Sequence, residues 1–144
     1  MYNLQQALID HISDNFTGAT IRTIQPYAGE LEGNAIKATQ PVPAVFVFVK
    51  GDKIRRNQDD DVDVALIVIT DSKSLDPATK RNNNLQLSST LAAWLAQEAN
   101  ELFYSTAAPT RAYHIIPEIE IRIHSITTKY CAVIIGLQIK DRIK

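Results

Sequence analysis

The stretch that decides the fold runs from Val42 to Ile69 and reads VPAVFVFVKGDKIRRNQDDDVDVALIVI. It contains two apolar runs, Val45–Val49 and Val62–Ile69, which predict strands because β-branched and aromatic side chains suit a pleated surface. Their near-continuous apolar content is typical of strands covered on both faces. Between the runs we expect a loop of mixed charge that carries Lys50, Lys53, Arg55, Arg56 and Asp59–Asp63.

Two segments around this stretch predict helices. The first has an apolar stripe at three- and four-residue spacing, with Asn3 as the expected N-cap and Gly18 just past the end. The second has Asp76-Pro77 as a helix-start signal, and the helix begins there or later. The stripe of the first helix is Leu4, Ala7, Leu8, Ile12 and Phe16. The stripe of the second, which should lie across the sheet, is Leu87, Leu91, Trp94, Leu95, Ala99 and Leu102.

Further strands are predicted on both sides. Thr20–Tyr27 suits a short outer strand because it ends near Pro26. Ile119, Ile121 and Ile123 alternate with Glu120, Arg122 and His124, which indicates a strand with one wet face. Tyr130–Ile139 should pair with that strand as an antiparallel hairpin through Thr127–Lys129. We interpret Gly29–Gln40 and Tyr104–Pro117 as connectors, with Tyr104–Pro117 irregular.

These elements predict one α+β domain over residues 1–144, with a mixed, mostly antiparallel sheet of about five strands and two main helices packed on it. The 15 basic and 16 acidic side chains give a net charge of -1. No overall field therefore favours nucleic acid or an anionic membrane.

Compartment is predicted from the single cysteine and from hydropathy. Cys131 is the single cysteine, so no disulfide can form within the chain. Because it lies in an apolar run, we interpret it as a small core hydrophobe, which fits a reducing compartment. No apolar stretch approaches the roughly 18 residues that span a bilayer, and the N-terminal residues do not resemble a signal peptide. We expect a protein made and folded in the cytosol.

Candidate chemistry is sparse, and we predict no catalytic, cofactor-binding or metal-binding residue. Asp59, Asp60, Asp61 and Asp63 could bind a hard cation, but they lack the glycine and distal glutamate of an EF-hand loop, so a solvated acidic turn is the favoured interpretation.

The three histidines, His11, His114 and His124, lack the spacing of a metal site, and we expect His124 on the solvent-exposed face of its strand. Ser88, Ser89 and Cys131 lack a recognisable base. The glycines form no phosphate-binding loop. The charged loop is either solvated or an electrostatic contact between subunits.

Several segments resemble a known family. They are the N-terminal ALIDHI, the run Pro26-Tyr27-Ala28-Gly29-Glu30-Leu31, the run Pro43-Ala44-Val45-Phe46-Val47-Phe48-Val49-Lys50-Gly51, and the strand VDVALIVI before the long helix. With the closing hairpin that ends in Ala132–Asp141, this order resembles the Mu-like tail-terminator proteins of contractile-tailed phages and prophages. Lys80–Asn84 departs from the family pattern, in which a glycine-bearing segment is expected before the second helix.

The resemblance implies a non-enzymatic subunit that forms a closed ring, expected to be a hexamer, on the head-proximal end of the tail. There it would stop tube or sheath growth and contact head-completion proteins. We expect it in the host cytoplasm during assembly and afterwards in the virion tail. The Gly51–Asp61 loop and the Gly29–Gln40 connector are the hypothesised contacts, through Lys53, Arg55, Arg56, Asp59, Asp60, Asp61, Glu30 and Glu32.

Two other function classes stay open. A head-completion or neck adaptor would use the same kind of fold with another partner. A small phage-encoded enzyme or ligand-binding protein would need a cleft with converging polar groups.

Overall fold

Seven strands share one sheet in the computed structural model of the protein, which describes residues 2–32, 35–36, 41–53, 60–71, 75–105, 111–127 and 129–143. The strand order is β1-β4-β5-β9-β7-β6, and β8 pairs with β9 beside this path. The bounds are β1 Thr23–Pro26, β4 Ala44–Lys53, β5 Asp60–Asp71, β6 Leu102–Tyr104, β7 Arg111–Ile115, β8 Glu120–Ile126 and β9 Tyr130–Ile143. β1 runs parallel to β4, and all other pairings are antiparallel. The long strand β9 is therefore shared, because β8 pairs with its first half and β7 with its second half.

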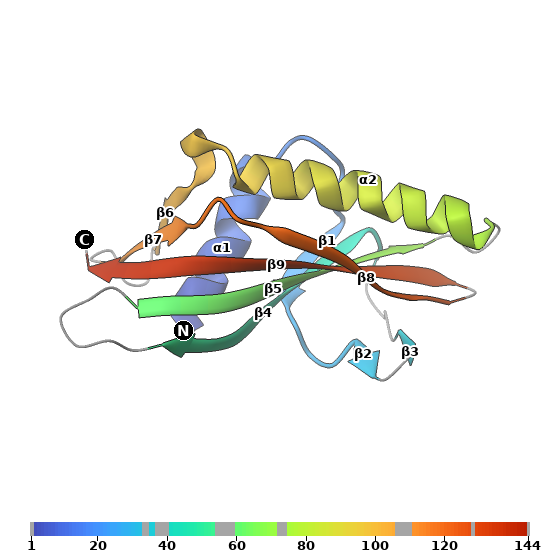
Figure 1. Ribbon diagram of the computed structural model, residues 1–144, viewed down its shortest axis with the longest axis horizontal. Coiled ribbons are helices and arrows are strands. Elements are labelled where there is room, and N and C mark those ends of the chain that lie inside the picture. The colour runs from blue at the N-terminus through green and yellow to red at the C-terminus, as the bar shows by residue number, and fades with distance from the viewer. Residues whose placement is uncertain are drawn as a thin grey trace.

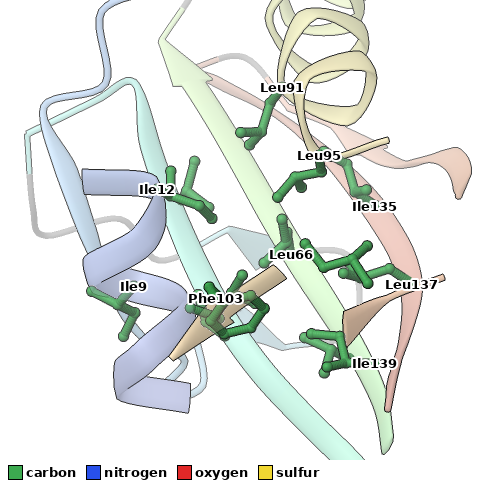
Figure 2. Packing of buried hydrophobic residues seen from close by; sticks show 14 of the residues in the cluster. Ile9, Ile12, Leu66, Leu91, Leu95, Phe103, Ile135, Leu137 and Ile139 are labelled. Carbon is green, nitrogen blue, oxygen red and sulfur yellow. The ribbon is translucent and has the colours of Figure 1, made fainter. Parts of the chain in front are cut away.

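Both α-helices, α1 (Tyr2–Asn15) and α2 (Pro77–Leu95), pack on one face of this sheet (Figure 1). α1 contacts β1, β4 and β6, whereas α2 contacts β5, β8 and β9. Figure 2 shows the main core between the layers, where side chains of both helices and of β9 point toward Leu66 of β5. The labelled residues there are Ile9, Ile12, Leu91, Leu95, Phe103, Ile135, Leu137 and Ile139.

A second, smaller core lies on the other face of the sheet. Its buried residues are Ala44, Phe46, Ile67, Ile69 and Ala132. Tyr27 and Leu31 pack against it, and a small two-stranded sheet, β2 (Leu31–Glu32) with β3 (Ala35–Ile36), lies on this side (Figure 1). Both faces of the first part of β4 and most of β5 are therefore buried, which explains why their sequences are almost continuously apolar.

The α+β class and the two helices on a mostly antiparallel sheet are as predicted, but the main sheet has seven strands and not about five. The α1 stripe is confirmed for Leu4, Ala7, Leu8 and Ile12, which are buried, whereas Phe16 is buried just after the helix ends at Asn15. The N-cap prediction for Asn3 is wrong, because α1 begins at Tyr2. The outer strand is confirmed as β1, which pairs only with β4 within the described chain.

α2 begins at the predicted signal and ends sooner than predicted. The Asp76 carboxylate accepts a hydrogen bond from the Thr79 N–H at 2.8 Å, and this bond lowers the pKa of Asp76. The helix ends at Leu95 because Gln97 is extended, with φ -70° and ψ 138°. Ala99 therefore lies in the 3₁₀ turn η1 (Glu98–Asn100), and Leu102 lies in β6 with 46% of its surface exposed.

Five other predictions need correction. Gly29–Gln40 contains β2 and β3, and Tyr104–Pro117 contains all of β7, so neither is only a connector. Strands β4 and β5 extend into the expected loop, so Lys50–Lys53 and Asp60–Asp63 are strand residues.

The strand β8 was expected to expose only its polar face, but Ile123 on the other face is 41% exposed. An extra residue, His124, bulges between the Ile123 and Ser125 pairings and breaks the alternation. Finally, Lys80–Asn84 is not a loop before the helix but a part of α2.

Candidate functional site

Those residues predicted to make contacts that the structure describes do not gather in one place. At one end of the sheet, the backbone of Lys53 lies directly opposite Asp61, and Asp60 lies opposite Asp141 on β9. Glu32 pairs with Ala35 in the small sheet, which Figure 1 places toward the other end of the molecule. Arg55, Arg56 and Asp59 lie outside the described residues. The predicted site is therefore two separate segments.

Glu30 is held within its own subunit. Only 9% of its surface is exposed, and its Oε2 accepts a hydrogen bond from the Ala28 N–H at 2.8 Å. This bond closes a turn around Gly29, whose φ of +89° is in the region that glycine tolerates best. Tyr27 completes the turn, because its hydroxyl donates to the Leu31 carbonyl at 3.0 Å. Glu30 thus shapes this segment from inside.

An aromatic pair on the sheet face away from the helices joins this turn to β4. The rings of Tyr27 and Phe48 lie 5.1 Å apart, and Phe48 is 41% exposed. The Tyr27 N–H donates to the Val47 carbonyl at 2.9 Å, which continues the β1–β4 pairing past Pro26. The pair therefore presents an exposed apolar side chain on a rigidly held backbone.

A polar groove of about 730 Å³ lies beside β5 and β9. Lys50 and Asp63 line one part of it and Glu118 and Glu120 another, while Gln138 donates from Nε2 to Asp63 Oδ1 at 3.2 Å. Three carboxylates against one ammonium group make this surface acidic. Within the described ranges, no cluster of three or more histidine, cysteine, aspartate or glutamate residues suits a metal ion.

A buried polar cluster under α2 was missed by sequence reasoning. Asn84 is fully buried and its Nδ2 donates to the carbonyls of Val68 at 2.9 Å and Cys131 at 2.8 Å. Ser88 donates to Asn84 Oδ1 at 2.8 Å, and buried Lys80 donates to the Thr127 carbonyl at 2.9 Å. The four-residue spacing of Lys80, Asn84 and Ser88 was the available signal, because it puts three polar residues on one helix face. The cluster ties α2 to β5, β9 and the β8–β9 turn.

Two of the chemically interesting side chains prove to be structural. Burial raises the pKa of the fully buried Cys131 thiol above its ordinary value, as expected for a core hydrophobe. His11 stacks on Phe103 and lies 5.0 Å from the ring of Trp94, and its Nε2 is 2.9 Å from the Asn100 carbonyl. Burial lowers the pKa of His11, although the hydrogen bond to Asn100 opposes this shift. His124 is exposed, and its Nδ1 is 2.9 Å from Ser125 Oγ.

These features define an α+β protein with two helices on one face of a mixed sheet and with exposed polar and apolar side chains on the sheet. Neither α-helix of the described chain has the length and apolar character of a membrane span. No family model matches the chain, and no curated protein matches it. A solved structure whose name gives no activity is similar to it, with a TM-score of 0.55 and 14% identity over 99% of this chain and 96% of the other. This likeness supports the fold alone.

Proposed function

We propose that the protein is a phage or prophage tail-terminator subunit, which caps the head-proximal end of a contractile tail and has no enzymatic role. The observation that carries the proposal is how the family-like segments pack. Pro43–Gly51 lies in β4 and the VDVALIVI strand lies beside it in β5, while Pro26 ends β1 on the other side of β4, where the Tyr27 N–H continues the pairing by donating to the Val47 carbonyl. Residues that carry the resemblance along the sequence thus form one continuous part of the fold.

The surfaces of this region suit contacts with other proteins. Phe48 offers an exposed apolar side chain, and Lys50 and Asp63 are exposed nearby on β4 and β5, where the backbone of Lys53 lies opposite that of Asp61. Aromatic side chains are enriched at protein interfaces, and complementary charges around them fix the register of the partners. In our proposal, unlike surfaces of neighbouring copies meet head to tail, and the rotation closes into a ring, expected to be a hexamer.

The proposed partners are copies of the chain itself, the tail tube and sheath proteins and the head-completion proteins. The subunit would assemble in the host cytoplasm and remain at the head-proximal end of the tail. Lys53, Arg55, Arg56 and Asp59–Asp61 would contribute the contacts at one end of the sheet. The segment around Glu32 would contribute from the other end, with Glu30 fixing its shape.

Deletion of the gene from the phage that encodes it tests the function, with tail length measured by negative-stain electron microscopy. The proposal predicts tails of abnormal and widely spread length, restored by the wild-type gene. Normal-length tails joined to heads would overturn it. Normal-length tails that fail to join heads would also overturn it and would favour the neck adaptor.

A charge reversal tests the contact residues separately. Arg55→Glu with Arg56→Glu should abolish ring formation and tail capping, because each substitution turns an attraction into a repulsion. The matched control is Arg81→Glu, a reversal at an exposed position of α2. If the double variant still forms rings and caps tails, these arginines are not contact residues.

A further inference from the structure

The strand β8 has an open edge. Within the described part of the chain it pairs only with β9, whereas β7, which pairs with the other half of β9, is covered by β6 (Figure 1). Ile123 and Ile126 of β8 are 41% and 36% exposed. An exposed edge strand with β-branched side chains is a template for pairing with another strand. The question is which strand fits this one.

The sequence of the edge is complementary to itself. Residues Glu118–His124, of which Glu118 and Ile119 precede β8, read EIEIRIH, with glutamate before Ile121 and Arg122 after it. When two copies of this segment run antiparallel with Ile121 at the centre, each residue faces the one equally far from Ile121 in the other copy. Within β8, Glu120 then faces Arg122 on either side of the central Ile121 pair. Opposite charges directly across an antiparallel pair are stabilising, as are pairs of β-branched side chains.

No neighbouring register has this property. Centring the pair on Glu120 sets glutamate against glutamate, and centring it on Arg122 sets arginine against arginine. A shift by one residue sets isoleucines against charged side chains, because the side-chain period of a strand is two. The charge pattern therefore selects both the partner and the register.

The charged side chains are available for this pairing. Glu118, Glu120 and Arg122 are exposed and have no ion-pair partner among the described residues. The bulge at His124 lies at the end of the paired segment, so the central pairs fall on regular strand. Ile121 is half-buried because it packs against the main core, which holds the centre of the edge in place.

We propose that β8 is a homodimerisation edge: two copies join their β8 strands antiparallel about a two-fold axis at Ile121. The interface is isologous, since Glu120 of each copy meets Arg122 of the other. It joins two seven-stranded sheets into one. This proposal does not rest on the tail-terminator function, because the contact residues proposed for the ring lie elsewhere in the chain.

Charge reversal with rescue tests the proposal by sedimentation velocity over a range of protein concentrations. Wild type should show a monomer–dimer equilibrium. Arg122→Glu and Glu120→Arg should each raise the dimer dissociation constant at least about tenfold, because each creates two like-charge pairs. The double variant, Glu120→Arg with Arg122→Glu, restores both pairs in reversed order and should dimerise like wild type.

The matched control is Arg81→Glu, which should leave the dissociation constant unchanged. A wild type that is monomeric at every concentration would overturn the proposal. So would a double variant as weak as the single variants, or a larger assembly that none of these substitutions affects. The last result would leave the tail-terminator proposal standing.

A cross-link keeps the register testable if a charge-reversed variant folds poorly, as judged by circular dichroism. Chains with Glu120→Cys are mixed with chains that carry Arg122→Cys and are oxidised. Opposite residues of an antiparallel pair are close enough for a disulfide. The register predicts a disulfide-linked heterodimer and little homodimer from either chain alone, whereas absence of the heterodimer contradicts it. Cys131 does not interfere because it is fully buried.

Discussion

Asn84 and Ser88 lie one helical turn apart on the buried side of α2, and the Ser88 hydroxyl donates to Asn84 Oδ1 at 2.8 Å. This bond fixes the orientation of the Asn84 amide, whose Nδ2 is thereby directed at the backbone carbonyls of β5 and β9. One amide thus joins the helix to the two central strands of the sheet. A fully satisfied polar group inside an apolar core gives the packing a single register.

Asn84→Ala should therefore lower the free energy of unfolding by about 3 kcal/mol, because it removes three hydrogen bonds and leaves buried polar groups without partners. Asn84→Asp should be at least as damaging, since a carboxylate cannot donate to the two carbonyls. Urea denaturation followed by circular dichroism measures both. The neighbouring Asn83→Ala is the control, because Asn83 is exposed and its loss should change stability by less than about 0.5 kcal/mol. Equal effects at positions 83 and 84 would contradict this role of Asn84.

Cys131 makes stability depend on alkaline pH. Burial raises the pKa of the folded thiol above its ordinary value of 9.0, so the unfolded chain loses this proton first as pH rises. The contribution is fully present below pH 9 and is lost as pH rises toward the folded pKa. Urea denaturation of wild type and Cys131→Ala at pH 7.5 and 10 should show a larger decline for wild type. Parallel declines would contradict the prediction, because the other titrating groups are common to both proteins.

His11 makes stability depend on pH in the opposite direction. Burial holds the pKa of its imidazole below the ordinary value of 6.5, so acid protonates the unfolded chain first. The contribution of His11 is present above pH 6.5 and is lost as pH falls through the folded pKa. The stability advantage of wild type over His11→Gln should therefore shrink between pH 7.5 and 5. Trp94, the single tryptophan, lies 5.0 Å from His11 and reports unfolding by fluorescence. An advantage that stays constant would rule out this effect.

The turn between β1 and β2 is tested at Gly29, with Gly51 of β4 as the matched control. Gly29 has a φ of +89°, whereas Gly51 has no positive φ and open space around its Cβ position. Gly29→Ala should cost about 1–2 kcal/mol, because an L side chain is strained in this region. Gly51→Ala should be neutral or slightly stabilising, since alanine restricts the unfolded chain. Thermal denaturation compares the two, and an equal change in midpoint would contradict the role assigned to Gly29.

Elements with a regular apolar period could be predicted from the sequence. The stripe from Leu4 to Phe16 and most residues of the runs that became β4 and β5 face a core, so their apolar patterns are nearly complete. The helix-start signal at Asp76 is local chemistry, and it formed as predicted. The closing hairpin also depends on neighbouring residues only.

What was missed depends on distant contacts. The strand β6 has three residues, too few to show a period, and β7 owes its order to pairing with β9, far along the chain. Polar Lys80 and Asn84 resembled a loop because the backbone carbonyls that they bind come from the β8–β9 turn, β5 and β9. Of the predicted contact residues, Glu30 is turned inward by its bond to the Ala28 N–H, which sequence patterns do not reveal.

The central claim, that the protein ends tail growth, is tested most directly with purified components. Tail-tube subunits of the same phage are polymerised with and without the purified protein, and tube lengths are measured by electron microscopy. The account predicts that the protein binds at one tube end and stops elongation at that end, so that tubes shorten as its concentration rises. Unchanged tube lengths and no density at either end would contradict the account.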